Sequence, residues 1–254
     1  MTLNPRQTEL LDEVRKRGSV SLELLSTQFG VTLQTMRRDV KLLSDAGLLA
    51  RFHGGVRVPS STIKNIAYRQ RQQINHEAKR RIARAVAKAV PNGCSLIINI
   101  GTTTEAIAHE LLKHKGLRVI TNNLNVAATL SDNPDCEVII AGGAVRSRDR
   151  GIIGEVTVDF VRQFKVDIAL IGISGIESDG SLRDYDYREV KVARAIIEQS
   201  RAVWLAADQS KFNRPAMVRL GAIADLDRLF TDAMPPEPFP ALLHEAGVQT
   251  VLAA

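Results

Sequence analysis

Apolar and polar residues between Thr32 and Gly47 are spaced as in an amphipathic helix with two distinct faces. Thr32 is a suitable N-cap, and Gly47 stands where a helix can end in the left-handed region. The apolar face consists of Leu33, Met36, Val40 and Leu43. The opposite face carries the hydrogen-bond donors Gln34, Arg37, Arg38 and Lys41. These donors suit a helix that reads DNA, although a solvated surface helix would show the same pattern.

The neighbouring segments favour the DNA-reading helix. Pro5 to Gly18 and Ser21 to Gly30 predict two shorter helices, the second capped by Ser21. Leu49 to Val58 alternates as in a β-hairpin, with Gly54-Gly55 as the predicted turn. Two helices, a turn, a basic helix and a hairpin follow one another in a winged helix-turn-helix domain.

We expect the DNA-binding residues to lie on the third helix, at the cap of the second and in the hairpin. They are Ser21, Thr32, Gln34, Thr35, Arg37, Arg38, Lys41, Arg51, His53 and Arg57. Arginine can pair with guanine and glutamine with adenine, but the pattern does not separate base contacts from phosphate contacts. A dimer would read an inverted repeat in double-stranded DNA, with half-sites about one helical turn apart.

From Glu77 onward, short apolar segments alternate with helical ones. Predicted strands cover Ser95 to Ile100, Leu117 to Thr121, Glu137 to Ala141, Asp167 to Gly172 and Ala202 to Ala207. Predicted helices cover Glu77 to Val90, Glu105 to Leu112, Asn125 to Leu130, Val158 to Phe164 and Glu189 to Gln199. A strand, a helix and a last strand complete 229–254. This order predicts an α/β fold with a mostly parallel sheet. We therefore expect a winged domain at 1–58, a linker at 59–76 and a sensing and oligomerisation domain at 77–254.

Polar or glycine-rich loops follow five predicted strands, at the sheet edge where ligands bind in such folds. The loop from Ile100 to Thr104 opens a helix, so its amides and hydroxyls suit a phosphate. Candidate ligand-binding residues are Gly101, Thr102, Thr103, Thr121, Asn122, Asn123, Gly142, Gly143, Arg146, Gly172, Lys191, Asp208 and Lys211. Each loop alone fits a turn, a helix cap or a surface ion pair. Together they predict a site for a small polyol phosphate or sugar phosphate.

Charge is distributed unevenly along the chain. The net charge of +6 divides into +3 for residues 1–58 (9 basic, 6 acidic), +7 for 59–90 (8 basic, 1 acidic) and −4 for 91–254 (17 basic, 21 acidic). This distribution is typical of a protein with an N-terminal DNA-binding domain and a C-terminal domain that has another role. The chain has no apolar run of the roughly 20 residues that a membrane span needs, and no signal-peptide core, so we expect a cytoplasmic protein without a membrane partner.

The sequence gives little indication of catalysis or of bound metals and cofactors. Cys94 and Cys136 are expected to be reduced and buried, and the five histidines lack metal-ligand spacing, so no metal or cofactor is predicted. No Walker loop, nucleophile elbow or dinucleotide motif is present, so we expect no enzyme. An isomerase-like enzyme remains an alternative, because carboxylates and lysines accompany the predicted pocket. They are Asp184, Asp186, Glu189, Asp208, Lys191 and Lys211. An architectural protein and an activator also remain open.

Several of these residues resemble the DeoR family of bacterial transcriptional repressors. The resemblance lies in Arg6, Leu10 and Val14, in Thr32 to Val40 and in the hairpin Arg51 to Gly55, and it extends over essentially the whole chain. Met36, Val40 and Phe52 differ mildly from the commoner family residues. The resemblance implies a repressor whose C-terminal domain has the fold of ribose-5-phosphate isomerase and senses a phosphosugar.

Longer strings resemble the branch of the family that responds to glycerol 3-phosphate. They are Thr121–Ala127, Arg146–Asp149 with Gly151–Glu155, Gly172–Ile176, Ser178–Leu182 and Ser210–Phe212. They imply a homo-oligomer, a dimer or tetramer, that glycerol 3-phosphate or a similar phosphorylated polyol or sugar releases from its operator.

Overall fold

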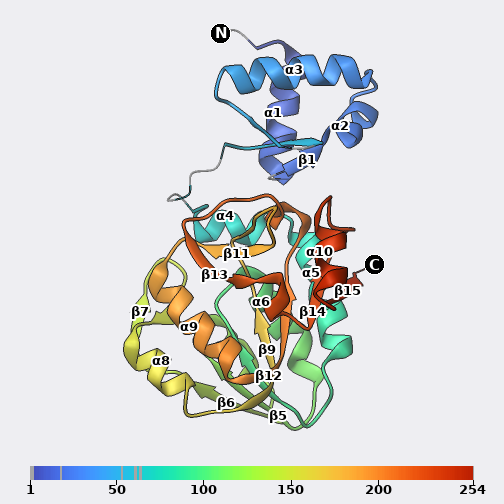
Figure 1. Ribbon diagram of the computed structural model, residues 1–254. Coiled ribbons are helices and arrows are strands. Elements are labelled where there is room, and N and C mark those ends of the chain that lie inside the picture. Colours follow the sequence, from blue (N-terminus) through green and yellow to red (C-terminus); the bar gives the residue numbers. More distant parts are fainter. Residues whose placement is uncertain (1–2, 18, 53, 60–61, 63–64, 254) are drawn as a thin grey trace. The chain divides into compact units, whose positions relative to one another are not determined.

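The computed structural model describes residues 3–17, 19–52, 54–59, 62 and 65–253. The chain divides into two compact units, residues 1–64 and residues 65–254 (Figure 1). The boundary falls inside the segment 59–76 that was expected to be a linker, and the second unit already begins at Asn65.

The first unit is a winged helix-turn-helix, as predicted. Its helices are α1 (Pro5–Arg17), α2 (Leu22–Gln28) and α3 (Leu33–Asp45), and its sheet has the order β1 (Ser19–Ser21), β3 (Gly55–Arg57), β2 (Ala50–Phe52). All three helices and β3 contribute fully buried side chains to one core, among them Leu10, Val14, Leu25, Met36, Leu43 and Val56. This core fixes α3 against the rest of the unit, whereas Leu33 at its first turn is only partly buried.

The hairpin turns one residue earlier than the sequence predicted. Phe52 pairs with Gly55, so Gly55 belongs to β3 and not to the turn. The packing of Phe52 explains this register. A Cβ atom at Gly55 would lie 2.9 Å from Cε1 of Phe52 and 2.8 Å from the carbonyl oxygen of Val20. Strand β1, which was not predicted, pairs with β3 and brings Val20 opposite Val56.

The second unit is built on a seven-stranded sheet in which every neighbouring pair is parallel. Its order is β15 (Gln249–Leu252), β14 (Arg228–Thr231), β12 (Ser200–Ala206), β9 (Val166–Ile171), β4 (Ser95–Ile98), β5 (Leu117–Thr121) and β6 (Cys136–Ile140). The predicted α/β class with a mostly parallel sheet is therefore confirmed. Because all strands run the same way, the loops after β12, β9, β4, β5 and β6 share one edge.

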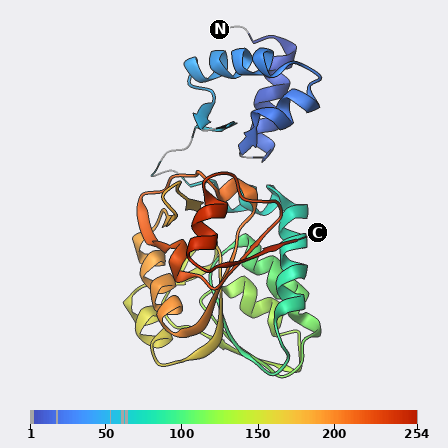
Figure 2. The ribbon, with the colours of Figure 1, turned by 45° about the vertical axis from the view of Figure 1, so that its right-hand side comes forward.

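Helices cover both faces of this sheet (Figures 1 and 2). One face packs against α5 (His76–Ala89), α6 (Thr102–Glu110) and α7 (Leu124–Leu130), and the other against α8 (Glu155–Val161), α9 (Tyr187–Glu198) and α10 (Phe239–Glu245). Two apolar cores result, one on each side of the sheet. The helices thus fix the positions of the strand ends and of the loops that follow them.

Three features of the second unit were not predicted. A hairpin of β7 (Ala144–Arg146) and β8 (Gly151–Ile153) follows β6, and a small antiparallel sheet joins β10 (Gly175–Ile176), β11 (Ser181–Asp184) and β13 (Val218–Ala222). Helix α4 (Tyr68–Gln73) lies within the expected linker. Short 3-10 turns cover Leu111–Lys113, Gln209–Lys211 and Ile223–Asp225.

Both cysteines are free, but only Cys94 is buried. Cys136 is partly exposed because it begins β6, the edge strand of the sheet, so the expectation of two buried thiols was wrong for this residue. Among the described residues, no helix is both long enough and apolar enough to cross a membrane.

Candidate functional site

Helix α3 presents its predicted donors to solvent. The Oγ1 atom of Thr32 accepts a hydrogen bond from the backbone N–H of Thr35 at 3.2 Å and so starts the helix. Met36, Val40 and Leu43 are buried. The side chains of Gln34, Arg37, Arg38 and Lys41 are exposed, and Lys41 forms an ion pair with Asp45 at 2.8 Å. The helix therefore has the two faces that its sequence predicted.

Asp39 is a residue that positions α3 and that the sequence pattern did not single out. It lies on α3 between the basic positions, yet only 4% of it is exposed. Its carboxylate accepts hydrogen bonds from Nε of Arg6 at 2.8 Å and from Nε2 of Gln7 at 3.0 Å, and it pairs with a terminal nitrogen of Arg6 at 2.7 Å. It therefore ties α1 to α3. The signal was its spacing, three residues after Met36 and four before Leu43, at the margin of the buried stripe.

The other predicted DNA-binding residues surround α3. Ser21 caps α2 by accepting a hydrogen bond from the N–H of Leu24, Arg51 is exposed on β2 and Arg57 is half-buried on β3. His53 lies outside the described residues. A groove of about 820 Å³ runs along α3 and is lined by Arg6, Gln34, Thr35, Arg37, Arg38, Lys41 and Arg51, among others. These side chains form one mainly basic surface.

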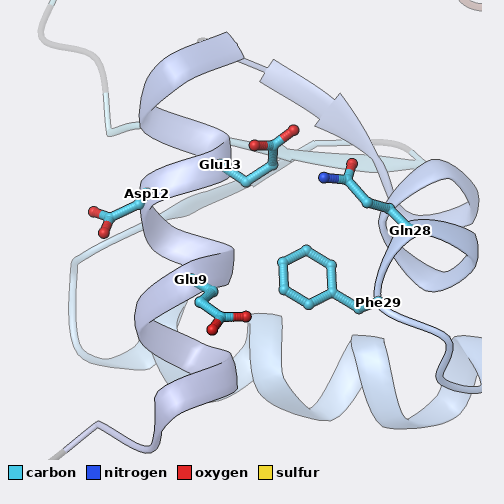
Figure 3. Close-up of a pocket in the computed structure, with 5 residues that line it drawn as sticks. All are labelled: Glu9, Asp12, Glu13, Gln28 and Phe29. Carbon is cyan, nitrogen blue, oxygen red and sulfur yellow. The ribbon is translucent and has the colours of Figure 1, made fainter.

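A second groove in this unit has the opposite charge. It measures about 550 Å³ and lies between α1 and the end of α2, where Glu9 and Glu13 approach the ring of Phe29 (Figure 3). Asp12 and Gln28 complete the lining. Carboxylates repel a phosphate backbone, so the α3 surface suits DNA better than this groove does.

In the second unit, the loop after β4 forms the N-terminus of α6. Gly101 is its N-cap, and Oγ1 of Thr104 lies 2.8 Å from the carbonyl oxygens of both Asn99 and Gly101. The amides of the first helical turn, including those of Thr102 and Thr103, have no acceptor within the helix. They are available to an anion.

The loop after β5 brings further polar groups to the same edge. The hydroxyl of Thr121 donates to the carbonyl of Ile98 at 2.7 Å, and the side chain of Asn123 caps α7. Asn122 is 1% exposed and donates to the carbonyl of Ile152 at 3.1 Å. The Oδ1 atom of Asn122 is buried without a hydrogen-bond partner, which is uncommon for a buried acceptor.

The loop after β12 holds a buried set of charged groups. Asp208 accepts hydrogen bonds from Nδ2 of Asn75 at 2.9 Å and from the N–H of Ser210 at 3.0 Å. Burial alone would raise the pKa of Asp208, but Lys211, Ser210 and Lys79 together hold it below its ordinary value. Burial, reinforced by the charge of Arg214, lowers the pKa of Lys211 to about 7. A lysine whose pKa is lowered in this way gains a proton readily when an anion binds beside it.

Arg146 is already paired with carboxylates. It lies in β7, and its guanidinium contacts Asp149 at 2.8 and 2.7 Å, Asp186 at 2.9 Å and Glu189 at 2.5 Å. Burial and the charge of Asp184 raise the pKa of Glu189 to about 7, although Arg146 opposes the shift. Three carboxylates use the donors of Arg146, which leaves it poorly placed to bind a ligand.

Of the remaining candidates, Gly172 follows β9 beside α6, where its added Cβ would stand 3.8 Å from the carbonyl oxygen of Ile100. Gly142 accepts a hydrogen bond from Thr157 at 2.8 Å, and a Cβ on Gly143 would collide with the same residue. Lys191 is exposed and pairs with the exposed Glu155 at 2.6 Å. Position at the strand ends favours Gly101–Thr103, Thr121–Asn123, Gly172, Asp208 and Lys211, and does not favour Arg146 or Lys191.

Residues 65–79 also reach this edge, which the sequence reasoning missed. The hydroxyl of Tyr68 donates to Glu105 at 2.8 Å, Arg71 approaches Asp149 at 3.5 Å, and Lys79 donates to the backbone carbonyl of Arg71. The positive charge of residues 59–90 was the available signal, but helix α4 has no buried side chain and so no apolar stripe to predict it.

Sequence comparisons agree with this architecture. Residues 6–62 match the DeoR-like helix-turn-helix domain, and residues 74–233 match the DeoR C terminal sensor domain. The chain belongs to the DeoR family of transcriptional regulators.

Among its relatives, the chain is 49% identical to the glycerol-3-phosphate regulon repressor of Escherichia coli K12 over 99% of its own length and 100% of that protein. It is 39% identical to the transcriptional repressor CsqR of the same organism, over 99% of this chain and 96% of the relative. These relatives are repressors, and the chain is a DNA-binding transcriptional repressor rather than an enzyme.

One solved structure illustrates a remote likeness of fold. Ribose 5-phosphate isomerase A of Methanocaldococcus jannaschii superposes with a TM-score of 0.41 at 14% identity, covering 54% of this chain and 55% of the isomerase. A likeness at this level carries no information about activity.

Proposed function

We propose that the protein represses genes of glycerol 3-phosphate metabolism and leaves its operator when glycerol 3-phosphate binds the second unit. The near full-length identity of 49% to the glycerol-3-phosphate regulon repressor carries this proposal. The site supports it chemically, because hydroxyls, amides and buried cations gather at one sheet edge. As a DNA-binding protein it would work in the cytoplasm.

In this proposal the exposed donors of α3 read the operator. Arg37, Arg38, Gln34 and Thr35 enter the major groove, and the hairpin arginines Arg51 and Arg57 reach neighbouring phosphates or the minor groove. Ser21, Thr32 and Lys41 supply phosphate contacts at the ends and flank of the surface. Two copies of the chain on an inverted repeat double these contacts, so a homo-oligomer is the binding species.

The ligand occupies the carboxyl ends of the strands. Its phosphate lies against the first turn of α6 and Lys211, and its hydroxyls reach the free acceptor of Asn122 and the carboxylate of Asp208. Linkage requires that the ligand bind more tightly to the form that releases DNA. The ligand then lowers the affinity for DNA by the same factor by which DNA lowers the affinity for the ligand.

Thermal unfolding of the purified protein tests the ligand. Glycerol 3-phosphate should raise the melting temperature, with glycerol, inorganic phosphate and fructose phosphates as controls. A ligand at 100 times its dissociation constant adds about 2.7 kcal/mol to the native state. An electrophoretic mobility assay with the operator then follows release by the same compound.

The controls separate the alternatives. A shift with a fructose phosphate and none with glycerol 3-phosphate would keep a phosphosugar sensor but overturn the proposed regulon. No shift with any compound would overturn the sensor and favour a body that only assembles subunits.

A further inference from the structure

We propose that Arg71 of helix α4 binds the anionic group of the effector, which makes the segment after the winged domain part of the ligand site. This inference rests on the proposed function. Residue 71 lies between the two matched family regions, 6–62 and 74–233, so neither match assigns it a role.

Polar bonds hold α4 in place. None of its side chains is buried, and Tyr68 is its main anchor. The Tyr68 hydroxyl donates to Glu105 at 2.8 Å and accepts from Asn125 at 2.9 Å. Burial and the carboxylate of Glu105 raise the pKa of Tyr68, so the phenol stays protonated and keeps donating. The anchor sets Arg71, one turn further along α4, beside the strand ends.

Arg71 is shielded from water but poorly paired. Its side chain is 17% exposed, and its guanidinium approaches Asp149 at 3.5 Å. Asp149 already receives two shorter bonds from Arg146, at 2.8 and 2.7 Å. The Nε atom of Arg71 is buried without a hydrogen-bond partner. A guanidinium offers five donors, and among the described residues this one has only the long contact with Asp149 and a cation-π contact with the ring of Tyr68, 5.9 Å from its Cζ atom.

Other cations lie close to Arg71. Lys79 donates to its backbone carbonyl, and the charges of Arg214, Lys79 and Arg71 add to burial in lowering the pKa of Lys211. Of the carboxylates described above, Asp208 is the one that acts on both lysines. Positive charge gathered in a partly dry site is unfavourable until an anion neutralises it.

A phosphate monoester supplies both the acceptors that Arg71 lacks and the negative charge that the clustered cations lack. Its oxygens accept the fork of donors that arginine presents, and its charge offsets the nearby lysines. The phosphate replaces the long contact between Arg71 and Asp149. Because α4 is the first helix of the second unit after the winged domain, a ligand that binds Arg71 acts directly on the chain segment leading to the DNA-binding unit.

The test uses the full-length protein and calorimetric titration with glycerol 3-phosphate and, in parallel, inorganic phosphate. Arg71→Ala should weaken ester binding about 10- to 100-fold, the range for a lost charged hydrogen bond. Arg71→Lys keeps the charge but loses the paired donors of the guanidinium, so its affinity for the ester should lie between those of the wild type and Arg71→Ala. Arg69→Ala is the matched control, because Arg69 is exposed on the same helix and should leave the affinity unchanged.

The operator assay adds a second readout. Arg71→Ala should still bind operator, and the ester concentration that releases it should rise in proportion to the loss of affinity. Unchanged ester affinity in Arg71→Ala overturns the role of Arg71 and leaves the proposed function standing. If the wild type binds neither compound, both proposals fail. Should Arg71→Ala not fold, Arg71→Lys decides, since an affinity equal to wild type would overturn the inference.

Discussion

Replacing Asp39 by asparagine should destabilise the winged domain far more than its place on a basic helix suggests. The carboxylate oxygens face donors on both sides, Arg6 at one oxygen and Gln7 at the other. The new NH₂ group of asparagine must therefore face a donor. Turning the Gln7 amide does not help, because its Oε1 accepts from the N–H of Asn4 at 3.2 Å.

The size of the effect follows from these contacts. Charged hydrogen bonds contribute roughly 1.5–3 kcal/mol each when they are well shielded. The Arg6 side chain is 40% exposed, which places its contribution at the lower end. We expect Asp39→Asn to remove about 2 kcal/mol. Small domains have only about 0.05–0.15 kcal/mol of stability per residue, so this is a large share for a unit that ends at residue 64.

Hydrogen exchange of the full-length protein measures this loss where it occurs. Amides of α3 should exchange about 30-fold faster in Asp39→Asn, whereas amides of α6 in the other unit serve as an internal reference. Asp45→Asn is the matched control, because Asp45 lies on the same helix in an exposed ion pair with Lys41, and such pairs contribute under about 1 kcal/mol. Equal exchange of α3 in both variants would refute the reasoning.

Three further predictions concern other parts of the molecule. Arg38→Ala should weaken operator binding at least about tenfold in a mobility assay without lowering the melting temperature, because the side chain is exposed; unchanged affinity would contradict its role. Gly55→Ala should destabilise the hairpin by about 1–3 kcal/mol through collision with Phe52, and faster exchange of β3 amides would report it. Glu189 has a raised pKa of about 7, so its contribution to stability is full below its unfolded pKa and falls as pH rises towards 7. Chemical denaturation should show that this fall is missing in Glu189→Gln; an identical pH profile would count against the shift.

The larger elements could be predicted because their patterns are carried by apolar residues. The strand Leu117–Thr121 was predicted with its observed bounds, and α3 with its cap at Thr32. The bounds of this strand and of this helix follow from apolar side chains that must be buried. The same reasoning correctly placed five polar loops at one sheet edge, since parallel strands end together.

The elements that were missed depend on contacts between distant residues. The turn at Gly54-Gly55 offered two registers, and only the ring of Phe52 against Gly55 selects one. Helix α4 depends on Glu105 and Asn125, far from it in sequence. Arg146 was expected at the ligand because arginine suits phosphate; its ion pairs with Asp186 and Glu189 could not be predicted, since they form only where β7 and α9 meet.

The way α4 is attached also bears on how the sensitivity of this repressor is set. It is held by separate polar bonds, and none of its own side chains is buried in an apolar core. If the effector binds Arg71 as proposed, a substitution on the exposed side of α4 should change the opposition between ligand and operator with little effect on the folding of either unit. Under the proposal that Arg71 binds the effector, this segment would set the sensitivity of the repressor to metabolite concentration, separately from the residues that recognise the rest of the metabolite and from those that read DNA.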